Sequence, residues 1–125
     1  MKAWWVVLVT AVGSACSHDC SSVGYVSGVE VQLPAGAWSL SEFCVDDHCL
    51  SDAALSANSR FVDLVDEPAE YSWRIRLVQP DGTELARQGT VTTKSVRLNG
   101  AGCSPVTANA VLVVDEAGVV TVGTP

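Results

Sequence analysis

Residues 71–79 read YSWRIRLVQ, and this stretch decides the fold. Its side chains alternate between an apolar face, Tyr71, Trp73, Ile75 and Leu77, and a polar face, Ser72, Arg74 and Arg76. Such a period of two is typical of a strand with one buried face. The next three residues, PDG, favour a turn, because proline fixes φ and glycine accepts a positive φ. The stretch therefore predicts a strand that turns back into a second strand over residues 83–93.

Segments of the same kind lie on both sides of this hairpin. We expect strands over residues 28–33, 38–45, 60–65, 110–114 and 119–122, and residues 94–98 to continue the strand over residues 83–93. Gly89 predicts a bulge in the strand over residues 83–93. The alternation in residues 38–45 is not pure: one face would hold Trp38, Leu40 and Cys44, and the other Phe43 and Val45. Residues 51–59 are a short helix capped by Asp52 or a loop.

Together these segments predict an all-β protein, an antiparallel sandwich of about seven strands, because turns recur at short intervals without βαβ alternation. The pattern resembles an immunoglobulin-like sandwich, and a transthyretin-like or other small sandwich is the alternative. Trp73 lies between two earlier cysteines and Cys103, which matches the immunoglobulin signature only in part. We expect this domain to span residues 24–125.

The charge of the chain restricts its partners. The formal net charge is -7, from 14 acidic and 7 basic residues, and the acids are dispersed. A negative chain does not attract nucleic acid, whose affinity for proteins depends on neutralising phosphates with lysine and arginine. We therefore expect no nucleic-acid partner.

The first residues, MKAWWVVLVTAVGSACSHDC, have the pattern of an export signal. Lys2 is followed by an apolar block over residues 3–12 and by three small residues before Cys16. The block is shorter than the roughly 20 apolar residues that a membrane span needs. We expect residues 1–15 to be a cleaved signal peptide.

The exit of this segment, GSAC at residues 13–16, resembles the lipobox of bacterial lipoproteins, in which small or aliphatic residues precede a cysteine. The resemblance implies that the Cys16 thiol carries a diacylglycerol and that residues 16–23 are a lipidated tether. It also implies an anchor at the extracytoplasmic face of the cell membrane. Ordinary cleavage after Ala15, which gives a secreted protein without lipid, is the alternative. The richness in Val, Ala and Gly and the scarcity of Lys resemble small uncharacterised lipoproteins of the actinobacterial type.

The chain has five cysteines, an odd number. If Cys16 is acylated, four remain, and four can form two disulfides. Cys44 and Cys49 flank a hairpin neck, CVDDHC, in which opposite residues lie within disulfide range. We expect the pair Cys44–Cys49, and by elimination Cys20–Cys103.

The hairpin neck also holds the sharpest polar cluster, Asp46, Asp47 and His48, with Asp52 close behind. Two carboxylates and an imidazole can bind Ca²⁺ or Zn²⁺, but the same residues suit a solvated turn. The sequence contains no nucleophile elbow, P-loop or dinucleotide fingerprint. We therefore expect neither catalytic residues nor a cofactor.

Two further groups have a binding interpretation and a structural one. Trp38, Tyr71 and Trp73 could stack on sugars, or they could be core residues at alternating strand positions. Arg74 and Arg76 share a strand face and could meet an anionic wall polymer or pair with acidic neighbours.

These expectations lead to a membrane-anchored extracytoplasmic lipoprotein that serves as a non-catalytic binding or structural module, with a protein or cell-wall partner. The alternative is a lipoprotein that scavenges metal or another ligand through the loop of residues 46–52.

Overall fold

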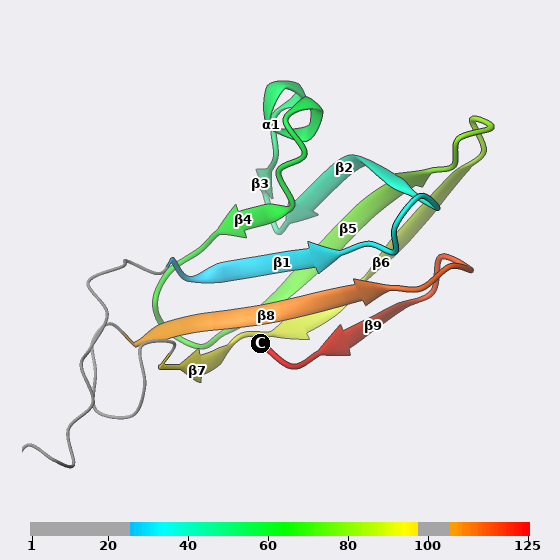
Figure 1. Ribbon diagram of the computed structural model, residues 1–125. Helices are drawn as coiled ribbons and strands as arrows, with labels where there is room; N and C mark the ends of the chain where they lie inside the picture. Colours follow the sequence, from blue (N-terminus) through cyan, green and yellow to red (C-terminus); the bar gives the residue numbers. More distant parts are fainter. Residues whose placement is uncertain (1–25, 98–105) are drawn as a thin grey trace, which may run out of the picture.

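The computed structural model describes residues 26–97 and 106–125, which form two facing β-sheets (Figure 1). One sheet contains β1 (Gly28–Gln32), β4 (Phe61–Asp63), β7 (Lys94–Val96), β8 (Thr107–Val114) and β9 (Val120–Gly123). The other sheet contains β2 (Ser39–Val45), β3 (His48–Cys49), β5 (Glu70–Val78) and β6 (Glu84–Thr92). The prediction of an all-β sandwich is confirmed, with nine strand segments in the described residues where about seven strands were expected.

The strand order of the two sheets separates the alternatives for the fold. The first sheet runs β4-β1-β8-β7, with β9 also paired to β8, and the second runs β3-β2-β5-β6. In the immunoglobulin arrangement the first two strands share a sheet, whereas β1 and β2 lie in different sheets here. The immunoglobulin arrangement is therefore excluded, and a transthyretin-like or other small sandwich remains. One pairing differs from the antiparallel expectation, because β1 and β8 run parallel.

The core lies between the two sheets and takes side chains from both. It includes Val29, Val31 and Leu112 from the first sheet and Phe43, Val45, Ile75 and Leu77 from the second, all at most 1% exposed. The apolar face predicted for residues 71–79 is thus the buried face of β5. Burial of each such side chain contributes about 1.5–3 kcal/mol relative to full exposure.

A β-bulge explains the mixed alternation in β2. The pairing of β2 with β5 shifts register between Leu40 and Glu42. Leu40 therefore faces the core before the bulge, Phe43 and Val45 face it after the bulge, and Cys44 lies on the outer face. A bulge adds one residue to one strand and moves all later side chains to the opposite face.

The prediction of a bulge near Gly89 is wrong, because the β5–β6 hairpin is regular there. Its register is continuous from Glu70↔Thr92 to Val78↔Glu84, with Gly89 opposite Trp73. The packing of Trp73 explains the glycine at position 89, because a Cβ there would lie 2.8 Å from Trp73 Cζ2. Beyond Thr92 the chain crosses to the other sheet, where β7 pairs with β8.

The remaining connections follow local sequence. The segment over residues 51–59 contains a short helix, α1 (Asp52–Ser56), but its N-cap is Ser51 and not Asp52 as predicted. The Ser51 hydroxyl accepts the Ala54 N–H at 3.1 Å, which satisfies one of the free donors at the start of the helix. The next strand, β4, spans Phe61–Asp63 and is shorter than expected.

Candidate functional site

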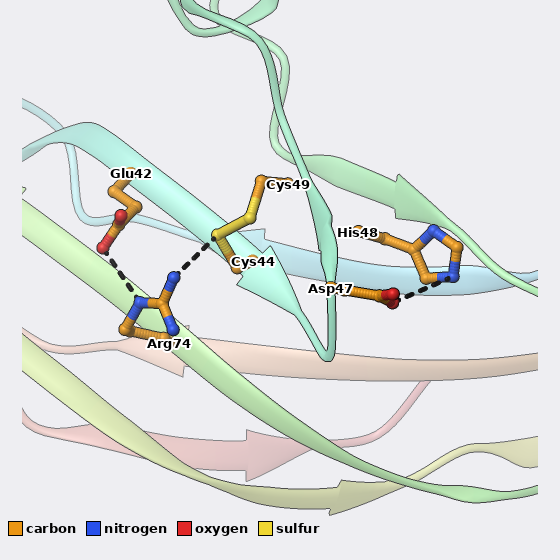
Figure 2. Close-up of a disulfide and its surroundings, with 6 residues drawn as sticks. All are labelled: Glu42, Cys44, Asp47, His48, Cys49 and Arg74. Carbon is orange, nitrogen blue, oxygen red and sulfur yellow. Dashed lines mark hydrogen bonds and ion pairs between the residues drawn. A yellow bond between two sulfur atoms is a disulfide. The ribbon is translucent and has the colours of Figure 1, made fainter.

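A disulfide between Cys44 and Cys49 closes the β2–β3 hairpin, as predicted (Figure 2). The two residues are direct cross-strand partners with Cα atoms 4.0 Å apart. The hairpin turns at Asp46, which has a positive φ of 52°. Aspartate tolerates this conformation because its short polar side chain can bond locally.

Asp46 also fastens the hairpin to the neighbouring strand β5. Its backbone N–H donates to Ser72 O at 2.7 Å, and its Oδ1 accepts the Ser72 N–H at 2.9 Å. The Asp46 carboxylate therefore has a structural role. These bonds hold the tip of the hairpin beside β5.

Arg74 lies beside the disulfide on this outer face (Figure 2). Its Nε donates to Glu42 Oε1 at 3.2 Å, and its Nη2 donates to Cys44 Sγ at 3.4 Å. The Arg74 side chain is 53% exposed, so the ion pair contributes at most about 1 kcal/mol to stability. An arginine has five N–H donors, so this guanidinium retains donors for a ligand.

A shallow depression of about 410 Å³ surrounds Arg74 on the same face. It is lined by Cys44, Asp46, Ser72, Trp73, Arg74, Gln88, Gly89 and Thr90. The guanidinium, an amide, two hydroxyls and a carboxylate together offer both hydrogen-bond donors and acceptors. Such a surface suits a polar ligand with an anionic group near the guanidinium. We take this depression, the Arg74 depression, as the candidate site.

The candidate metal ligands of the loop over residues 46–52 do not form a cluster. Asp47 and His48 point away from the disulfide on the side opposite Glu42 and Arg74 (Figure 2). Their side chains are 95% and 62% exposed, and Asp47 Oδ1 lies 3.9 Å from His48 Nε2. Asp52 is in the first turn of α1. Across residues 26–97 and 106–125, no three His, Cys, Asp or Glu side chains lie close enough to share a metal ion.

The aromatic residues belong to the core and not to a stacking platform. Trp38 and Trp73 are each 7% exposed, and Tyr71 packs against the core cluster. Trp38 Nε1 donates to Glu116 O at 3.2 Å, in the turn between β8 and β9. Trp73 Nε1 is buried without a hydrogen-bond partner among the described residues.

Sequence reasoning singled out Arg74 but missed Glu42, Gln88 and Thr90. Gln88 could have been found, because the turn at residues 80–82 fixes the register that places it opposite Arg74. Glu42 could not, since the unpredicted bulge in β2 decides which face it occupies. The predicted lipidation site, Cys16, and the predicted pair Cys20–Cys103 lie outside the described residues.

Comparisons with known proteins give no relative for this chain: no family model, no curated protein and no solved structure matches it. Among the helices of the described residues, none has the length and apolar character needed to span a membrane.

Proposed function

We propose that this chain is an exported lipoprotein, anchored through Cys16, whose β-sandwich binds a cell-wall component without catalysis. The observation that supports export best is the Cys44–Cys49 disulfide. Disulfides persist in oxidising compartments outside the cytoplasm. The apolar leader over residues 3–12 and the lipobox-like segment GSAC at residues 13–16 support the anchor.

The anchor is tested by the mass of the N-terminus and by cell fractionation. We expect the mature chain to begin at Cys16 with the mass of a diacylglycerol added, and to sediment with membranes. Cys16→Ser should release the chain into the soluble fraction, whereas Ser17→Ala should leave it on the membrane. A mature N-terminus with a free Cys16 thiol would overturn the anchor and favour the secreted alternative.

The Arg74 depression supports the binding part of the proposal. Its half-exposed guanidinium pairs with Glu42 and lies among hydroxyl, amide and carboxylate groups, and arginine forms strong charge-assisted bonds to anionic oxygens. Arg74→Gln should weaken binding of the purified chain to an anionic wall polymer at least tenfold in a pull-down. Arg76→Gln is the matched control, because Arg76 shares the strand and face but does not line the depression. Equal losses for the two variants would leave only nonspecific charge attraction.

Scavenging of metal through residues 46–52 stays the alternative. Asp46 is engaged by the Ser72 N–H, and Asp47 and His48 are open to solvent, so we expect no heat and no thermal shift on titration with Ca²⁺ or Zn²⁺. A saturable heat that Asp47→Asn abolishes would establish the alternative.

A further inference from the structure

The outer edge of β6 carries a regular row of backbone groups that pair with no other strand of the described residues. Two hydrogen bonds fix the phase of the β5–β6 hairpin: Gln79 N–H to Thr83 O at 2.8 Å, and Thr93 N–H to Ala69 O at 2.9 Å. Hydrogen-bonded pairs alternate along an antiparallel ladder, so the odd-numbered residues of β6 bond to β5. The even-numbered residues therefore direct their N–H and C=O groups away from β5. These residues are Glu84, Ala86, Gln88, Thr90 and Thr92.

In the part of the chain that the structure describes, this edge lacks most of the features that usually protect an exposed strand. Natural edge strands are protected by proline, lysine, a bulge, a short length, an inward-pointing charge or a covering segment. β6 is nine residues long, ELARQGTVT, and pairs only with β5 among the described strands. It contains neither proline nor lysine, and its register with β5 has no shift. Its one protective feature of this kind is Arg87, whose side chain turns inward and donates from Nε to Gly118 O at 3.0 Å.

We propose that β6 pairs with β6 of a second copy of this chain, antiparallel and centred on Gln88. On the outer face this register opposes Gln88 to Gln88, Ala86 to Thr90, and Glu84 to Thr92. On the inner face it opposes Leu85 to Val91, and Arg87 to Gly89. The pairing joins the two four-stranded sheets into one continuous sheet.

The side chains of β6 favour a register centred on Gln88 over registers centred on Arg87 or Gly89. Apolar Leu85 meets apolar Val91, which extends the core across the junction, and the long Arg87 meets a residue without a side chain. No like charges are opposed in this register. A centre at Arg87 would oppose two guanidinium groups, and a centre at Gly89 would oppose Arg87 to Val91. Ala86 O accepts a bond from Arg87 Nη1 at 3.2 Å, and a carbonyl oxygen has a second lone pair for the partner strand.

The two-fold axis would pass beside the Arg74 depression. Gln88 and Thr90, which line that depression, are also residues of the proposed junction. The two depressions would therefore border one another across the axis and form one wider polar surface. This inference does not depend on the lipid anchor or on the ligand of the depression.

A charge swap at position 88 tests both the pairing and its register. Gln88 is exposed and its backbone does not bond to β5, so Gln88→Lys and Gln88→Glu should fold as the wild type does, which thermal melting checks. Each variant opposes two like charges at the axis. By sedimentation equilibrium at moderate salt, we expect a dimeric wild type and a dissociation constant raised at least tenfold in each variant. An equimolar mixture of the two variants should restore the dimer, because the new lysine of one chain then faces the new glutamate of the other.

The matched control is Gln32→Lys, the same substitution at an exposed position of β1 in the other sheet. It should leave the dissociation constant unchanged. A wild type that stays monomeric up to millimolar concentration would overturn the proposal. A dimer that is insensitive to charge at position 88, or that the mixture does not restore, would overturn it as well.

Discussion

Substitution of Gly89 by alanine tests the packing that replaces the predicted bulge. Gly89 is on β6, directly opposite Trp73 on β5. A methyl group at position 89 would lie 2.8 Å from Trp73 Cζ2, 3.0 Å from Cε2 and 3.1 Å from Nε1. Contacts this short require movement of the indole or of the strand. Trp73 is only 7% exposed, so the indole has little room to move.

Two opposing effects set the size of the change. Overpacking a core by a methyl group costs about 1–3 kcal/mol. Replacing glycine restricts the unfolded chain, which stabilises the folded state by about 0.4–1 kcal/mol. We therefore expect Gly89→Ala to lower the free energy of unfolding by about 1–2 kcal/mol. For a domain of roughly 60–100 residues, each kcal/mol lowers Tm by about 4–8 °C.

A double-mutant cycle with Trp73→Phe isolates the contact. The nearest of the three crowded atoms, Cζ2, belongs to the fused benzene ring of the indole, which phenylalanine lacks. Gly89→Ala should therefore cost much less in the Trp73→Phe background. The coupling energy should be about 1–2 kcal/mol in urea denaturation followed by far-UV circular dichroism. A Gly89→Ala variant that equals or exceeds the wild type in stability would refute this reasoning. So would an equal penalty in both backgrounds.

Three further predictions concern other parts of the fold. Cys44→Ser with Cys49→Ser should lower the free energy of unfolding by about 2 kcal/mol in urea, from the loop-closure entropy of a short loop, and an unchanged midpoint would contradict this. Ser27 is 1% exposed and its Oγ accepts the Ala108 N–H at 3.0 Å, so Ser27→Ala should cost about 1–3 kcal/mol by leaving that donor unsatisfied; a loss below about 0.5 kcal/mol would count against it. The backbone N–H of Thr83 holds the pKa of the Asp81 carboxyl below its usual range. A carboxyl whose pKa is lower in the folded than in the unfolded chain stabilises the folded state at pH values above the unfolded pKa. The stability advantage of the wild type over Asp81→Asn should therefore shrink as the pH falls through the folded-state pKa. NMR titration of the Asp81 carboxyl measures that pKa directly.

The sequence predicted those parts of the fold that depend on local pattern. Strict alternation in residues 71–79 and a turn at residues 80–82 are sufficient to place β5, β6 and the register between them. Cys44 and Cys49 are close in sequence, so the hairpin between them was also predictable. The parallel pairing of β1 with β8 could not be predicted, because it joins segments far apart in the chain and neither strand has a sequence feature that indicates its partner.

The candidate site was predicted only in part for a related reason. The alternation of residues 71–79 is enough to place Arg74 on the polar face of its strand. Its partner Glu42 follows a bulge that reverses the faces of β2, and no proline or glycine marks that bulge. The residues of the metal hypothesis that the structure describes form no cluster, because adjacent residues in a tight turn diverge and Asp46 bonds to Ser72 on another strand.

The regular pairing at Gly89 also has a consequence for the edge of the sheet. A bulge increases local twist and turns an edge strand away from possible partners. Here Trp73 packs over the glycine and β6 keeps a continuous register, so its outward backbone groups stay in a regular row.

Relief of the crowding in Gly89→Ala would displace β6 at the centre of the proposed junction. We therefore expect this variant to lose dimer affinity together with stability, and Trp73→Phe to restore both in the double variant. Sedimentation equilibrium beside urea denaturation measures the two properties on the same samples. If the double variant regains stability but remains monomeric, then the row of backbone groups on β6 is not what holds the two copies together.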